Sequence, residues 1–144
     1  MISFTVPGQP QGKGRAKIVK IGGFSRMATP QKTVAYEGLV AHAAQQAMKG
    51  RPLLDCAVQV YMTINCQIPA SWSQKKRTAA RLGEIRPTTK PDIDNVEKAI
   101  FDGCNGVVWR DDVCVVGVHK DKYYAGTPGV DVVIAPAVTA QEAA

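Results

Sequence analysis

The chain has 144 residues, 45% of them hydrophobic, and a formal net charge of +6 at pH 7. These values predict one globular domain over residues 1–135, a disordered alanine-rich tail over residues 136–144, and a polyanionic partner. No apolar run in the sequence is long enough to span a bilayer, so a transmembrane protein is excluded. Neither a signal-peptide pattern nor a C-x-x-C pair is present, so we expect a protein of the reducing cytoplasm that binds no zinc.

The first residues predict a strand followed by a basic, glycine-rich segment. Residues 2–6 alternate apolar and polar side chains, as a half-buried strand does. Residues 7–24 mix five glycines with basic side chains, and we interpret them as a flexible loop or hairpin that contacts DNA phosphates. A loop that is merely solvated is the alternative. The candidate DNA-binding residues of this segment are Lys13, Arg15 and Lys17.

A helix and a long strand are predicted next. Thr29 as N-cap and Pro30 as first helical residue begin a helix that runs to Met48 and ends at Gly50. Two neighbouring stripes can be traced on it: one is Val34, Gly38, Ala41 and Gln45, and the other is Ala35, Leu39 and His42. Residues 56–68 carry an apolar side chain at every second position, which predicts a central strand with one face on the helices.

The segment after that strand predicts a second, basic helix. Ser71 and Gln74 fit a capping box, so we expect the helix within residues 69–84. We interpret Trp72 either as a buried anchor or as a ring that stacks on DNA. The candidate DNA-binding residues here are Lys75, Lys76 and Arg77, with Lys90 beyond the helix.

Acidic residues gather between Lys90 and Asp112 of this otherwise basic chain. The stretch holds six of the twelve acidic residues, and these are Asp92, Asp94, Glu97, Asp102, Asp111 and Asp112. Asp94 and Glu97 fit a capping box, so Asp94 is expected to be the N-cap of a third helix. The buried stripe of that helix is expected to be Val96, Ala99, Ile100 and Gly103.

A second acidic pair follows the third helix. Asn105 and Gly106 predict a turn, and residues 113–118 predict a strand that begins directly after Asp111 and Asp112. If this strand packs beside the helix, the two acidic pairs meet. Carboxylate oxygens are the ligands that Mg²⁺ prefers, and its open positions take substrate phosphate and a water molecule. The sequence therefore predicts a divalent-metal site that acts on a polyanion.

Each of these residues also has a purely structural interpretation. Asp94 can serve only as a helix cap, and Asp92 only as a solvated turn residue. The second acidic pair can form a turn before its strand. Lys98 and Asp102 are four residues apart, so they can form a surface ion pair of small value. The metal-site hypothesis depends on the ordered set of acids rather than on any single one.

Three motifs in the acidic stretch resemble the RusA family of Holliday junction resolvases. They are K-P-D-x-D-N-x-x-K, F-D-x-x-N-G and W-x-D-D-x-x-V, and the similarity is strongest over residues 90–116. The opening F-T-V-P-G-Q-P-Q-G-K-G-R is also similar to the start of phage-type members. One departure is that the link from Asp102 to Asp111 is shorter, by about one residue, than in the best-known member.

The resemblance implies a small, homodimeric, Mg²⁺-dependent endonuclease that resolves four-way DNA junctions by paired symmetric nicks. Mn²⁺ can substitute for Mg²⁺, and no organic cofactor is expected. The implied catalytic residues are Asp92, Asp94, Asp112 and Lys98, and the implied metal ligands are Asp92, Asp94, Asp112 and Asp111. Such enzymes are common in phages and prophages, so we expect the cytoplasm of a bacterium or of a phage-infected cell.

The predicted fold is α+β, with a mixed sheet of about four or five strands and two or three helices packed on it, as in RusA. Two other functions remain open. One is a nuclease that acts on other branched DNA, such as flaps and forks. The other is a protein that binds branched DNA without cutting it, although bare carboxylates oppose DNA binding unless a metal is needed.

Overall fold

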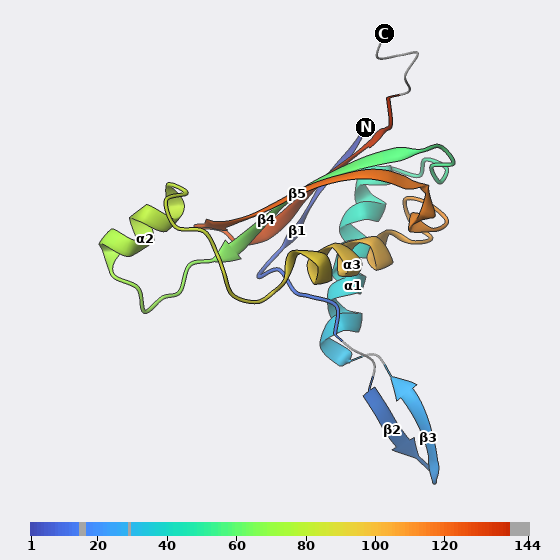
Figure 1. The fold of residues 1–144 in the computed structure, drawn as a ribbon. Coiled ribbons are helices and arrows are strands. Elements are labelled where there is room, and N and C mark those ends of the chain that lie inside the picture. Colours follow the sequence, from blue (N-terminus) through green and yellow to red (C-terminus); the bar gives the residue numbers. More distant parts are fainter. Residues whose placement is uncertain (15–16, 29, 139–144) are drawn as a thin grey trace.

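A four-stranded mixed sheet forms the centre of the fold in the computed structural model, which describes residues 1–14, 17–28 and 30–138. In spatial order its strands are β1 (Ile2–Pro7), β6 (Gly129–Pro136), β4 (Val58–Gln67) and β5 (Val115–Ala125). β6 is antiparallel to both of its neighbours, whereas β5 is parallel to β4. A parallel pair needs a long crossover, and here the crossover carries two helices (Figure 1). The α+β prediction is confirmed.

The alternation predicted for the long strand is confirmed in β4, which lies inside the sheet. Every second side chain is buried, and these are Val58, Val60, Met62, Ile64 and Cys66. The intervening side chains lie on the opposite face, where Tyr61 is 46% exposed. One face of the sheet is therefore covered and the other is open to solvent.

Two helices cover the buried face of the sheet. α1 (Gln31–Met48) and α3 (Ile93–Cys104) cross each other on the same side of it (Figure 1). The stripe predicted for α3 is confirmed, because all four of its members are buried. Neither stripe traced on α1 is its packed face, since Val34 is 51% and Leu39 38% exposed. The packed face is instead Thr33, Tyr36, Val40, Ala44 and Met48.

The helix starts differ from the predicted ones. Pro30 occupies the N-cap position of α1 and Gln31 is its first residue, whereas Thr29 lies outside the described residues. α2 (Gln74–Arg81) is capped by Ser73 rather than by Ser71, since the Ser73 hydroxyl accepts a hydrogen bond from the Lys76 amide at 3.2 Å. In both cases the helix begins later than the strongest sequence signal indicates.

The basic N-terminal segment consists of two parts rather than one loop. Residues 12–14, which we call the strap, lie against the two main helices: the Lys13 amide donates to the Asn95 carbonyl (3.0 Å), and the Gly14 amide donates to Thr33 Oγ1 (2.9 Å). A Cβ atom at Gly12 would stand 2.9 Å from Asn95 Cβ, so glycine permits this close approach. The strap is thus packed, contrary to the flexible loop that we expected.

The second part is a hairpin of β2 (Lys17–Ile21) and β3 (Phe24–Ala28), which projects from the body of the molecule beyond the start of α1 (Figure 1). It forms a two-stranded sheet of its own. The expected hairpin is therefore present. The candidate Arg15 lies outside the described residues.

The end of the chain also differs in detail. The strand predicted over residues 113–118 begins later and is longer, because a 3₁₀ turn, η1 (Asp112–Cys114), precedes β5. The predicted tail begins at Pro136, which still belongs to β6, and residues 139–144 of it lie outside the described part. Within the described ranges, no helix has the length and apolar character needed to cross a membrane.

The α1–α3 crossing generates a stability prediction. A Cβ atom at Gly103 would stand 2.6 Å from Val40 Cβ and 3.0 Å from the Glu37 carbonyl oxygen, so Gly103→Ala forces the helices apart. We expect it to lower the free energy of unfolding by about 1–3 kcal/mol, measured by urea denaturation. Gly38→Ala is the matched control: outside the backbone of its own helix and its two chain neighbours, no atom would lie within 4 Å of the added Cβ. Better helix propensity should therefore stabilise the protein by about 0.5–1 kcal/mol. Equal stability of the two variants would contradict the packing argument.

Candidate active site

A buried tryptophan places the second acidic pair beside α3. Trp109 is wholly buried, and its Nε1 donates a hydrogen bond to Asn105 Oδ1 at 2.7 Å. Between them Gly106 adopts a left-handed conformation (φ 80°), and its amide donates to the Trp109 carbonyl at 2.7 Å. This tight turn reverses the chain after α3, so that η1, which begins at Asp112, contacts the helix.

The first acidic pair stands at the N-terminus of α3. The N-cap is Asp92 rather than Asp94, and the Asp92 carboxylate makes no capping hydrogen bond. Asp94 lies in the first helical turn, where a negative charge interacts favourably with the helix dipole. The structural interpretation of Asp94 as only a cap is therefore wrong. Neither carboxylate accepts a hydrogen bond from the free backbone amides at the start of α3.

Two lysines of β5, which the sequence reasoning missed, hold this corner in place. Lys120 Nζ lies 2.9 Å from Asp94 Oδ1 and 3.2 Å from Glu97 Oε2. Lys122 Nζ donates to the backbone carbonyls of Thr89 (2.8 Å) and Pro91 (2.9 Å). The hydrogen bond and the positive charge of Lys120 lower the pKa of Asp94. Lys120 and Lys122 lie opposite core-facing residues of β4 and are two residues apart on β5. This spacing, which places them on the same face of the strand, was the only sign in the sequence that they act together.

Lys98 lies on the exposed side of α3 and forms an ion pair within that helix. Its Nζ is 3.0 Å from Asp102 Oδ1, which confirms the ion pair between residues four apart. The hydrogen bond to Asp102 raises the pKa of Lys98, and the nearby charge of Asp112 raises it further. Lys98 therefore stays protonated at neutral pH and faces the negative potential of η1.

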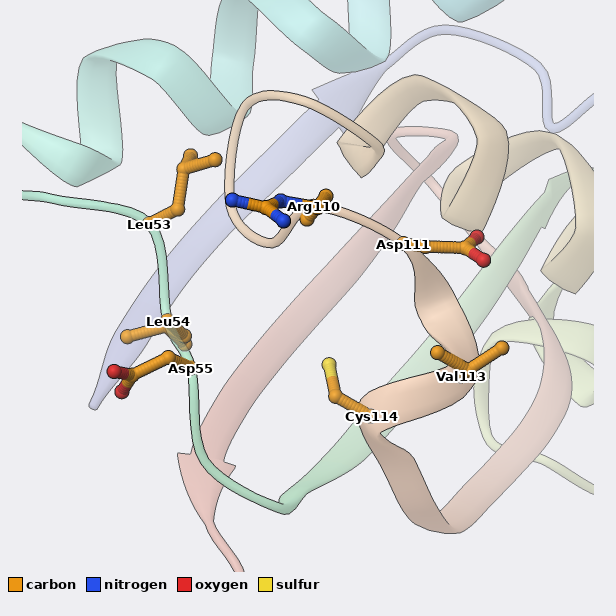
Figure 2. A pocket seen from close by; sticks show the side chains of 7 residues that line it. All are labelled: Leu53, Leu54, Asp55, Arg110, Asp111, Val113 and Cys114. Carbon is orange, nitrogen blue, oxygen red and sulfur yellow. The ribbon is translucent and has the colours of Figure 1, made fainter.

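Asp111 has a local structural role. Its Oδ1 accepts a hydrogen bond from the Asp112 amide at 2.9 Å and so caps η1. It also borders a mostly apolar hollow of about 450 Å³, across which Arg110 faces Leu53, while the Asp111 carboxylate points away from the hollow (Figure 2). None of the three candidate catalytic aspartates lines this hollow. It is therefore not where we place the chemistry.

The carboxylate oxygens of the site suit a hard divalent cation, although the predicted ligands do not form a complete coordination sphere by themselves. In the described part of the chain, no three His, Cys, Asp or Glu side chains are grouped closely enough to hold a metal ion. Mg²⁺ does not require such a group, because proteins usually bind it through one or two carboxylates together with substrate phosphate and water. The Asp92 and Asp94 carboxylates are both exposed at the helix start, and they supply the oxygen ligands that such an ion prefers.

The candidate DNA-binding residues occupy different environments. Lys75, Lys76 and Lys90 are exposed, and the Lys76 ammonium lies 4.0 Å from the centre of the Trp72 ring. Trp72 itself packs edge-on against Tyr124 with the ring centres 5.2 Å apart, which agrees with its interpretation as an anchor. The remaining candidates are Arg77, which is half-buried, Lys17, of which only the backbone is described, and Lys13, which is held in ion pairs.

Comparison with known proteins identifies the family of the chain. A protein from Bacillus subtilis (strain 168) named "Uncharacterized protein YqaN" is 36% identical over 137 residues, which cover 92% of this chain and 94% of that protein. The family model described as endodeoxyribonuclease RusA matches residues 7–135, a range that contains every site residue named above. The resemblance inferred from the three motifs is thereby confirmed, and the chain belongs to the RusA family of endodeoxyribonucleases.

Proposed function

We propose that the protein is a Mg²⁺-dependent nuclease that resolves Holliday junctions by paired symmetric nicks. The observation that carries this proposal is that Asp92 and Asp94 stand at the start of α3, while Lys98 of the same helix feels the charge of Asp112. These residues lie inside a chain that matches the RusA model over most of its length. Carboxylates alone repel a phosphodiester, so an acidic corner on a basic protein is favourable for DNA cleavage only when a cation joins the two.

Asp92, Asp94 and Asp112 are the residues that would hold the metal. When bound, Mg²⁺ polarises the scissile phosphodiester and lowers the pKa of a bound water molecule. Lys98, one helical turn beyond Asp94, contributes a positive charge where negative charge develops on the phosphate oxygens. Lys122 fixes the backbone that precedes Asp92, so the first acidic pair is held on a rigid support.

DNA would be held by positive side chains outside this centre. We assign this role to the hairpin, which begins with Lys17, to Arg15, which precedes it in the sequence, and to a second basic surface that comprises Lys75, Lys76, Arg77 and Lys90. α2 lies at one end of the molecule and the hairpin projects at another, so the two surfaces can contact different parts of a branched substrate (Figure 1).

Paired nicks require two active sites that reach opposite strands. One site per chain therefore implies a homodimer with two-fold symmetry, which matches the symmetry of a four-way junction. We place this activity in DNA recombination and repair, in the cytoplasm of a bacterium or of a phage-infected cell.

The deciding experiment compares a synthetic four-way junction with flap, fork, duplex and single-stranded DNA. We expect symmetric cleavage of the junction in Mg²⁺ or Mn²⁺, and none in chelator. Ca²⁺ should support binding without efficient cleavage, because its looser coordination positions the attacking water poorly. Equal cutting of flaps or forks would favour the branched-DNA nuclease instead. Binding without cleavage in every metal would favour a non-cleaving binder, and full cleavage in chelator would exclude the metal mechanism.

Asp112→Asn separates chemistry from binding. The substitution keeps the size and hydrogen-bonding capacity of the side chain but removes a charge that would ligate the metal. We expect the single-turnover cleavage rate to fall by at least about 100-fold, while the Kd for the junction stays equal or decreases. Asp55→Asn is the control, because Asp55 is an exposed carboxylate that borders the hollow described above and is not a candidate metal ligand. Normal cleavage by Asp112→Asn would show that Asp112 is only a turn residue.

Lys75→Gln tests the basic surface of α2. If Lys75 neutralises one phosphate, its loss should weaken junction binding and reduce the slope of log K against log salt by about one. The cleavage rate at saturating enzyme should stay unchanged. Lys49→Gln removes the same charge from an exposed position at the C-terminal end of α1, and it should alter neither quantity. Identical salt slopes for the two variants would exclude α2 as a DNA-binding element.

A further inference from the structure

The Asp102 carboxylate is shared between Lys98 and the strap. Its Oδ1 lies 3.0 Å from Lys98 Nζ, and its Oδ2 lies 2.9 Å from Lys13 Nζ. Only 17% of its side chain is exposed, against 58% for Lys98. Asp102 is thus a nearly buried group with both oxygens engaged: Lys98 is its neighbour on the same helix, and Lys13 is remote from it in the sequence.

Lys13 is held in this position by more than Asp102. Its Nζ also lies 2.6 Å from Glu37 Oε1 on α1. Its backbone amide is bonded to the Asn95 carbonyl, and the next amide is bonded to Thr33, so the strap fixes where the ammonium can reach. In the sequence, the strap ends shortly before the hairpin that we assign to DNA binding. Lys13 therefore ties the segment that precedes this hairpin to α1 and α3.

Lys13 and Lys98 both stabilise the charged carboxylate of Asp102, whereas their two positive charges repel each other. Burial alone would raise the pKa of Asp102, but the hydrogen bonds from Lys13 and Lys98 outweigh it and lower that pKa. The hydrogen bond to Asp102 raises the pKa of Lys98, whereas the charge of Lys13 lowers it. The strength of the ion pair between Asp102 and Lys98 thus depends on how much of the negative charge of Asp102 is neutralised by Lys13.

We propose that Asp102 is a positioning residue that holds the Lys98 ammonium toward the reacting phosphate, and that Lys13 weakens this hold. The role assigned to Lys98 rests on the proposed function, but the ion-pair geometry does not. This arrangement couples the strap to Lys98, the side chain that neutralises negative charge during cleavage. Lys13 then belongs to the support of the active site rather than to the DNA-binding surface.

The first experiment measures the free amine of Lys98 without DNA. Competitive labelling with an amine-acylating reagent, read by mass spectrometry at constant pH, reports the neutral fraction of each lysine. Asp102→Asn should speed the labelling of Lys98 by more than about twofold, because the neutral amine becomes more populated. Lys13→Met should slow it by more than about twofold, because Asp102 then acts on Lys98 alone. A merely structural role would loosen the site in both variants and speed labelling in both.

Glu97→Gln is the control for this measurement. It removes the same charge from the neighbouring position of the same helix, but Glu97 bonds Lys120 rather than Lys98. Labelling of Lys98 should therefore change by less than about twofold in this variant. Unchanged labelling in Asp102→Asn, or faster labelling in Lys13→Met, would overturn the proposal.

The second experiment uses single-turnover cleavage of the junction. Asp102→Asn should lower the rate at saturating enzyme by about tenfold without changing the Kd. In a Lys98→Ala background the same substitution should cause no further loss, because Asp102 acts through Lys98. A further fall of the cleavage rate in the double variant would show that Asp102 does not act through Lys98. If the wild type cuts no DNA, the proposed function fails, while the labelling result still decides whether Asp102 and Lys13 control Lys98.

Discussion

The burial of Trp109 is the constraint on which the site depends. The chain must reverse within a few residues after α3, and a large ring with a satisfied N–H group fixes that reversal in the core. Phe101, from the last part of α3, packs edge-on against the same ring with the centres 5.7 Å apart. The distance between the second acidic pair and α3 is therefore set by core packing rather than by the exposed acids themselves.

The fold could be predicted where one period dominates the local sequence. β4 alternates without interruption, and α3 has one narrow apolar stripe, so both buried faces followed from spacing alone. α1 is rich in alanine on all sides, and its packed face was decided by partners remote in sequence. Thr33 is buried because its hydroxyl accepts the Gly14 amide, and Val40 is buried because Gly103 leaves room for it. Neither contact has a local signal.

The candidate site divides in the same way. The acidic residues stand out because they are concentrated in a basic chain, and their order matches a family motif. Of their cationic partners, Lys98 could be predicted from its spacing to Asp102. Lys13 and Lys120 could not, since they reach the acids only through the tertiary fold. The cap of α3 was misplaced because Asp92 and Asp94 are equally suitable by composition, and only the backbone conformation distinguishes them. Sequence thus identified the charges, whereas the fold determined which charges neutralise one another.

The separate two-stranded sheet has a consequence for how such a chain can diversify. The hydrogen bonds of β2 and β3 are made within the hairpin, so the main ladder does not run through it. Lengthening, shortening or recharging the hairpin leaves the register of the other four strands untouched. The hairpin can therefore be exchanged as one peripheral module, while the geometry at the start of α3 is inherited unaltered.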